Sequence, residues 1–117
     1  MIAHITISTS RLQESLDFYQ WLLQLPIDRR LPRPEGDIVF LGENETKLEL
    51  IEDAAAERIT AKGLSIGFTV QNLNKKLALL DSKQIPHSGI IAPAPGVRFA
   101  FVIDPNGCAI QLFEQKH

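Results

Sequence analysis

The sequence predicts an α+β fold built from two tandem βαβββ modules that form a curved mixed sheet with a cleft. The main observation is a repeat, because residues 2–52 and residues 63–114 show the same order of strand, helix and three strands. Short segments of the two halves also align at offsets of 61 and 62 residues: 3–7 with 64–68, and 47–52 with 109–114. Each half further contains a proline-rich loop, at 31–36 and at 92–96. The chain is therefore expected to be a single domain, residues 1–117, made of these two modules.

The first module opens with a strand and an amphipathic helix. Polar and apolar residues alternate over residues 2–8, which predicts a half-buried strand with one polar face. Ser10 followed by Gln13 predicts a capping box at the start of the helix. Pro26 ends the helix. Its apolar stripe has helical spacing and consists of Leu12, Leu16, Tyr19 and Leu23.

The remaining elements of the first module follow the loop at 31–36. Residues 37–41 and 46–51 predict two strands on either side of a polar turn. On the second of these strands Leu48 and Leu50 face the core, which places Glu49 on the opposite face together with Lys47. These two side chains are expected to be able to pair.

The second module repeats this plan. Alternation over residues 64–70 predicts a strand with Leu64 directed toward the core, and Asn72 is expected to cap the following helix. Two strands over 97–103 and 108–114 then flank a strong turn signal, Asp104-Pro105-Asn106-Gly107.

Composition excludes several classes of function. Hydrophobic residues make up 44% of the chain and charged residues 22%, with a net charge of −2, as in an ordinary soluble domain. The sequence has no basic patch and no apolar run of about 20 residues, so neither nucleic acid nor a membrane is an expected partner. The single Cys108 and the absence of a signal peptide predict a cytoplasmic protein. Because each half is small, the halves are expected to pack together and the chain to form a homodimer.

Three segments of the chain resemble a known family. They are the opening strand His4–Ile7, the helix from Ser15 to Leu25, and the closing hairpin from Asp104 to Leu112. Together they resemble the vicinal oxygen chelate superfamily, which includes glyoxalase I, bleomycin and fosfomycin resistance proteins, methylmalonyl-CoA epimerase and extradiol dioxygenases. The resemblance covers essentially the whole chain and implies the paired βαβββ fold.

The resemblance also implies four metal-ligand positions, which correspond here to His4, Glu49, Ser65 and Gln111. His4 and Glu49 match a common ligand pair, and Gln111 would offer an amide oxygen where glutamate is usual. Ser65 stands where histidine is usual, and a hydroxyl is a poor ligand for zinc or nickel. The implied metal set is therefore His4, Glu49 and Gln111, with a divalent ion (Ni, Zn, Mn or Mg) bound weakly or not at all.

The implied function is that of a glyoxalase-like lyase or isomerase, related to lactoylglutathione lyase, acting on a small molecule with vicinal oxygens. Glu49 would be its catalytic base, and no organic cofactor is expected. The alternative is a metal-free protein of the bleomycin-resistance type that binds an antibiotic or metabolite. Extradiol ring cleavage is disfavoured, because it needs two histidines and the mapped positions contain only one. The substrate, any thiol carrier, and whether the cleft lies within one chain or across a dimer are left open.

Other reactive residues are expected to be structural or solvated. His87 is expected to be exposed, Arg98 to lie at a solvated strand end, and Cys108 to be an inert packing residue. His117 is expected to be disordered. Four phenylalanines could line an apolar pocket, although core packing is expected for most of them: Phe40, Phe99, Phe101 and Phe113.

Overall fold

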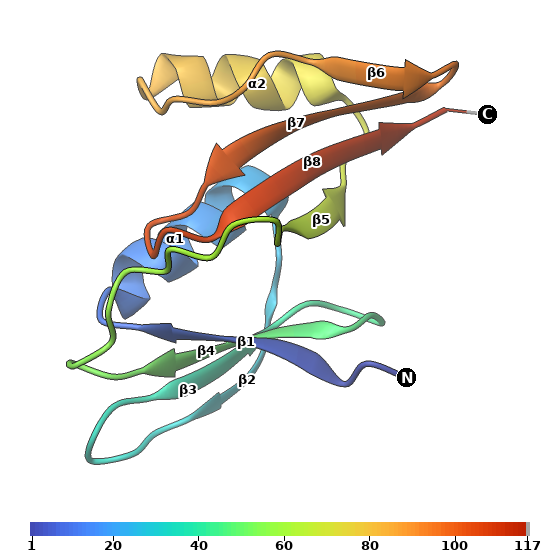
Figure 1. Cartoon of the computed structure of the whole chain (residues 1–117). Helices are drawn as coiled ribbons and strands as arrows, with labels where there is room; N and C mark the ends of the chain where they lie inside the picture. Colours follow the sequence, from blue (N-terminus) through green and yellow to red (C-terminus); the bar gives the residue numbers. More distant parts are fainter. Residues whose placement is uncertain (117) are drawn as a thin grey trace. The chain divides into compact units, whose positions relative to one another are not determined.

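The computed structural model describes residues 1–116 of a chain that forms two compact units, Met1–Ile59 and Thr60–His117. Each unit contains one helix and one four-stranded sheet, in the order strand, helix, three strands (Figure 1). The α+β fold of two βαβββ modules with two mixed sheets is thus confirmed. That the modules form one domain with a shared cleft stays a prediction, and His117 lies outside the described residues. No helix within residues 1–116 is long and apolar enough to cross a membrane.

Unit 1 is a mixed sheet with one helix that contacts its strand β4. Strand β1 runs parallel to β4, and the other two pairs are antiparallel, in the order β1-β4-β3-β2. Alternation puts one face of the sheet into the core, where Val39, Leu41 and Leu50 are fully buried. The elements are β1 (His4–Thr9), α1 (Leu12–Leu23), β2 (Ile27–Leu31), β3 (Ile38–Leu41) and β4 (Lys47–Glu52).

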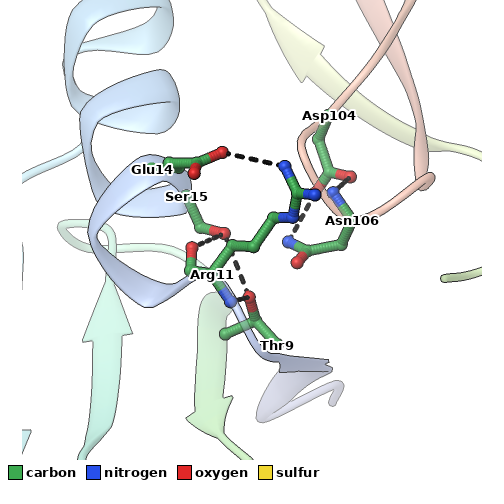
Figure 2. Close-up of polar contacts among 6 residues, drawn as sticks. All are labelled: Thr9, Arg11, Glu14, Ser15, Asp104 and Asn106. Atoms are coloured by element: carbon green, nitrogen blue, oxygen red, sulfur yellow. Dashed lines mark hydrogen bonds and ion pairs between the residues drawn. The ribbon is translucent and has the colours of Figure 1, made fainter. Parts of the chain in front are cut away.

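The predicted capping box at the start of α1 was wrong. Arg11 is the N-cap residue, and no side chain caps the helix there. The hydroxyl of Thr9, buried at the end of β1, instead accepts the N–H of Arg11 at 2.9 Å (Figure 2). Ser15 donates its hydroxyl to the carbonyl of Arg11 at 2.7 Å. The chain therefore turns one residue later than the capping box requires, so Ser10 does not reach the cap position.

Both predicted proline-rich loops lose residues to strands. Leu31 belongs to β2, and most of the loop at 92–96 forms β6 (Ile91–Ala94). Both β2 and β6 are edge strands of their sheets. Pro93 is tolerated in β6 because an edge strand has one row of N–H groups that need no partner in the sheet.

Unit 2 repeats the architecture with strand order β5-β8-β7-β6. As predicted, Asn72 caps α2, accepting the N–H of Lys75 at 3.1 Å. The expectation for Leu64 was wrong, since it precedes β5 and is 69% exposed. The elements besides β6 are β5 (Ile66–Thr69), α2 (Leu73–Ser82), β7 (Val97–Ile103) and β8 (Ala109–Gln115).

Candidate functional site

The strand registers place the candidate residues at equivalent points of the two sheets. In unit 1, Thr6 of β1 and Phe40 of β3 both lie beside Glu49 of β4. In unit 2, Gly67 of β5 and Phe101 of β7 lie beside Gln111 of β8. The equivalence of Glu49 and Gln111 indicated by the sequence repeat is therefore present in the pairing of the strands.

In unit 1 the structure brings His4 and Glu49 together. The Nε2 atom of His4 lies 3.5 Å from Oε1 of Glu49. The Glu49 side chain is only 12% exposed, whereas that of His4 is 43% exposed. The ring of Phe40 meets the imidazole edge to face, with centroids 5.7 Å apart. The result is a largely buried carboxylate beside a more accessible imidazole.

Thr6 is a third member of this cluster that the sequence analysis did not identify. Its Oγ1 donates a hydrogen bond of 2.5 Å to Oε1 of Glu49. The available signal was that Thr6 shares the polar face of the first strand with His4. Its partner depends on the register of a parallel pair, which alternation alone does not determine.

The alternative in which Lys47 pairs with Glu49 does not occur among the contacts of the described residues. The Nζ atom of Lys47 donates to the carbonyl of Gly42 at 2.8 Å and lies 3.7 Å from Oδ1 of Asp28. Lys47, the first residue of β4, is thus held by the carbonyl of Gly42 and the carboxylate of Asp28. Glu49 interacts with Thr6 and His4 instead.

The two remaining predicted positions lie in unit 2. Gln111 is half-buried on β8, between the buried Ile110 and Leu112, so it does lie off the core face. Ser65 is exposed and immediately precedes β5. Their role as ligands, and that of His4 and Glu49, stays a prediction.

Comparison with known proteins identifies the family. Residues 1–112 match the Glyoxalase/Bleomycin resistance protein/Dioxygenase superfamily. The chain belongs to this superfamily. The lactoylglutathione lyase of Neisseria meningitidis is 26% identical, over 98% of this chain and 91% of its own length.

Solved structures of several proteins are similar to this fold. The trypanothione-dependent glyoxalase I of Leishmania major is 26% identical, with a TM-score of 0.79 over 96% of this chain and 84% of that protein. A glyoxalase family protein from Enterococcus faecalis is 25% identical, with a TM-score of 0.76 over 97% of both chains. An antibiotic-binding protein from Streptomyces shares the fold alone, at 15% identity and a TM-score of 0.71 over 99% of this chain and 96% of that one.

The donor set of this superfamily member is short for a metal site. Within residues 1–116, no group of three or more His, Cys, Asp or Glu side chains is placed to hold a metal ion. Unit 1 supplies one imidazole and one carboxylate, whereas catalytic zinc sites usually have three protein ligands. His4 and Glu49 therefore fit an ion that is ligated mainly by water or by substrate oxygens.

The superfamily member also has an aromatic face in unit 2, where the expectation of core packing was wrong. The four phenylalanines considered for the core, Phe40, Phe99, Phe101 and Phe113, are all half-buried. On β7 the smaller aliphatic residues Ala100 and Val102 fill the core face instead. Phe99 lies beside Phe113 across β7 and β8, and Phe101 lies beside Gln111. The rings of Phe99 and Phe101 meet edge to face at 5.6 Å.

Two charged residues of unit 2 that were expected to be solvated are engaged in structural contacts. The Nε of Arg98 donates to Oε1 of the buried Glu114 at 3.0 Å, and Oε2 of Glu114 accepts the N–H of Leu73 at 2.8 Å. The Leu73 N–H bond, followed by the Arg98 bond, lowers the pKa of Glu114. The half-buried His87 lies 2.7 Å from Asp81 Oδ1 and 2.6 Å from the carbonyl of Ser88.

Cys108 has the properties expected of an inert thiol. Burial, and to a smaller extent the nearby Asp104 carboxylate, raises its pKa to about 11. Asp104 itself accepts the N–H of Asn106 at 2.8 Å (Figure 2). It also accepts the N–H of Cys108 at 2.8 Å, and so closes the turn before β8. The thiol is therefore protonated at neutral pH and does not act as a nucleophile.

Proposed function

We propose that this protein is a lyase or isomerase, related to lactoylglutathione lyase, that moves a proton on a small substrate with vicinal oxygens. The observation that supports this is the cluster of His4, Thr6 and Glu49 on the open face of the first sheet. A carboxylate that is only 12% exposed and held by a hydroxyl is well suited to proton transfer.

In this proposal Glu49 removes a proton from the carbon beside a carbonyl group. It then returns the proton to the former carbonyl carbon, so that the carbonyl group moves to the neighbouring carbon. His4 is more exposed and contacts the same carboxylate, so it is placed to bind a substrate oxygen. His4 and Glu49, with Gln111 as the predicted third ligand, would hold a divalent ion (Ni, Zn, Mn or Mg), which would supply positive charge beside the substrate oxygens.

A metal-free binding protein is the second candidate, and the aromatic face of unit 2 favours it. Phe99, Phe101 and Phe113 form a half-buried face on which a flat ligand can stack. An antibiotic-binding protein from Streptomyces has a similar fold, which supports a small-molecule binding role. In both proposals the partner is a small molecule, and the protein is proposed to act as a homodimer.

One experiment separates the two candidates. Chelator-treated protein is titrated with Ni²⁺, Zn²⁺, Mn²⁺ and Mg²⁺ while the melting temperature is measured, and the hemithioacetals that methylglyoxal forms with glutathione and with trypanothione are assayed as substrates. The enzyme proposal expects turnover that is lost in Glu49→Gln, and a metal-dependent rise in melting temperature that is lost in His4→Ala. Absence of turnover, or turnover that Glu49→Gln leaves unchanged, rejects the enzyme proposal.

A further inference from the structure

We propose that Thr6 is a positioning residue that fixes the Glu49 carboxylate, so that Oε1 is occupied and Oε2 exchanges the proton. The inference rests on the proposed function, because it assigns separate tasks to the two oxygens of its base. It adds a residue that neither the family resemblance nor the sequence pattern indicated.

The contact between Thr6 and Glu49 follows from the sheet itself. Thr6 and Glu49 are direct neighbours in the parallel β1/β4 pair, so their side chains leave the sheet on the same face. The 2.5 Å separation of Oγ1 and Oε1 lies in the range of a charge-assisted bond from a hydroxyl to a carboxylate. The branched Thr6 side chain has a restricted χ1, so its hydroxyl is a stiff support.

The two carboxylate oxygens of Glu49 have different surroundings. Both Thr6 Oγ1 and His4 Nε2 approach Oε1, at 2.5 and 3.5 Å. No residue between 1 and 116 donates a hydrogen bond to Oε2. Oε2 therefore keeps its lone pairs for a substrate proton, while the bonds at Oε1 hold the group in one orientation.

The second module provides an internal comparison. Gly67 occupies the position of Thr6, and Gln111 that of Glu49. A Cβ at residue 67 would lie 3.2 Å from Oε1 of Gln111, which is a crowded contact, so in this side-chain conformation Gln111 occupies space that a side chain at 67 would need. Within the described part of unit 2, the Gln111 side chain has no hydrogen bond. The supporting hydroxyl is thus present only in the half of the chain that has the carboxylate.

The test compares Thr6→Val, which keeps the branched shape but removes the hydroxyl, with Thr6→Ser, which keeps the hydroxyl. Thr46→Val is the matched control, because the Thr46 hydroxyl donates to the carbonyl of Ile2 at the exposed start of β4. With the hemithioacetal of methylglyoxal and glutathione as substrate, Thr6→Val is expected to lower kcat roughly tenfold or more with a smaller change in KM. Thr46→Val is expected to keep the parent kcat, and Thr6→Ser, which keeps the hydroxyl without the branch, is expected to lose less kcat than Thr6→Val. A parent-like kcat in Thr6→Val overturns the positioning role.

A second measurement needs no substrate. Three-bond NMR couplings about χ1 and χ2 of Glu49 are expected to report one rotamer in the parent and in Thr6→Ser, and averaging in Thr6→Val. Averaging in the parent, or a single rotamer in Thr6→Val, also overturns the inference. Loss of the rotamer in Thr6→Val together with no turnover in the parent supports the positioning role and rejects the proposed enzyme, so the two failures are distinguishable.

Discussion

The two halves of the chain share one backbone plan and differ in the chemistry that they place on it. The same ladder positions hold Thr6 and Glu49 in unit 1, but Gly67 and Gln111 in unit 2. The charged and hydrogen-bonded cluster is therefore confined to the first sheet. A duplicated scaffold of this kind keeps its register while one half retains the ionisable groups.

The neighbours of Glu49 and Gln111 also differ between the two units. Next to Glu49 the open face of unit 1 carries His4 and a single phenylalanine, Phe40. Next to Gln111 the open face of unit 2 carries the aromatic side chains of β7 and β8. Unit 1 is suited to proton transfer and unit 2 to apolar contact, and the following experiments test this division.

The largest effect is expected from the base itself. Glu49→Gln removes the ionisable group and is expected to lower kcat by about 10²–10⁴-fold, since this is the usual contribution of a general base. Gln111→Ala, at the equivalent position of unit 2, is expected to lose less. Glu57→Gln, an exposed carboxylate in the linking segment, is the control for the loss of one charge. An equal loss in Glu49→Gln and Gln111→Ala would show that the chemistry is not confined to unit 1.

A feature that both halves share should respond in the same way in each. Gly36 has φ +136° and Gly96 has φ +77°, and a Cβ at either position would lie 2.5 Å from a backbone oxygen. Gly36→Ala and Gly96→Ala are each expected to lower the free energy of unfolding by roughly 2–3 kcal/mol, measured by urea denaturation. Gly63 also has a positive φ of +76° but has no atom within 4 Å of its Cβ position. A loss in Gly63→Ala as large as in Gly36→Ala would mean that the backbone angle, rather than the clash, is responsible.

A smaller effect is expected where the equivalent carboxylates of the two halves differ. Glu114 is buried, and its carboxylate accepts hydrogen bonds from the first N–H of α2 and from Arg98. The side chain of the half-buried Glu52 of β4 has, among residues 1–116, a single hydrogen bond, from the N–H of Asp37 at 3.0 Å. Glu114→Gln is expected to cost roughly 1–2 kcal/mol and Glu52→Gln less, measured by urea denaturation.

The pH dependence of stability gives an independent check on Glu114. The pKa of Glu114 is lowered in the folded protein. The stability it adds is therefore present above the pKa of the unfolded chain, near the ordinary value of 4.5, and is lost as pH falls through the folded pKa. Glu114→Gln is expected to flatten the fall of the melting temperature on the acid side of 4.5. An unchanged acid profile would show that this carboxylate does not contribute to acid unfolding.

The sequence determines the faces of the strands better than it determines their partners. Alternation with a period of two placed His4, Glu49 and Gln111 off the core without knowledge of the pairing. The Thr6–Glu49 bond was not predictable in this way, because it depends on the register between β1 and β4, which are 43 residues apart at this point. Likewise, Lys47 meets Asp28 because β2 contains an irregularity between Ile27 and Arg29, which alternation does not encode.

The smallest expected effect concerns His87, which lies outside the proposed site. Both ring nitrogens face acceptors, Ser88 O at 2.6 Å and Asp81 Oδ1 at 2.7 Å, so the protonated ring fits best. The Ser88 carbonyl, followed by Asp81, raises the folded pKa above 6.5. The stability that this contact adds is therefore complete below pH 6.5 and is lost as pH rises through the raised folded pKa.

The melting temperature, measured as a function of pH above 6.5, is expected to fall slightly in the parent and to stay constant in His87→Gln, with Asp81→Asn giving an intermediate slope. The effect should be small because Asp81 is 69% exposed, and identical slopes in the parent and His87→Gln would exclude it.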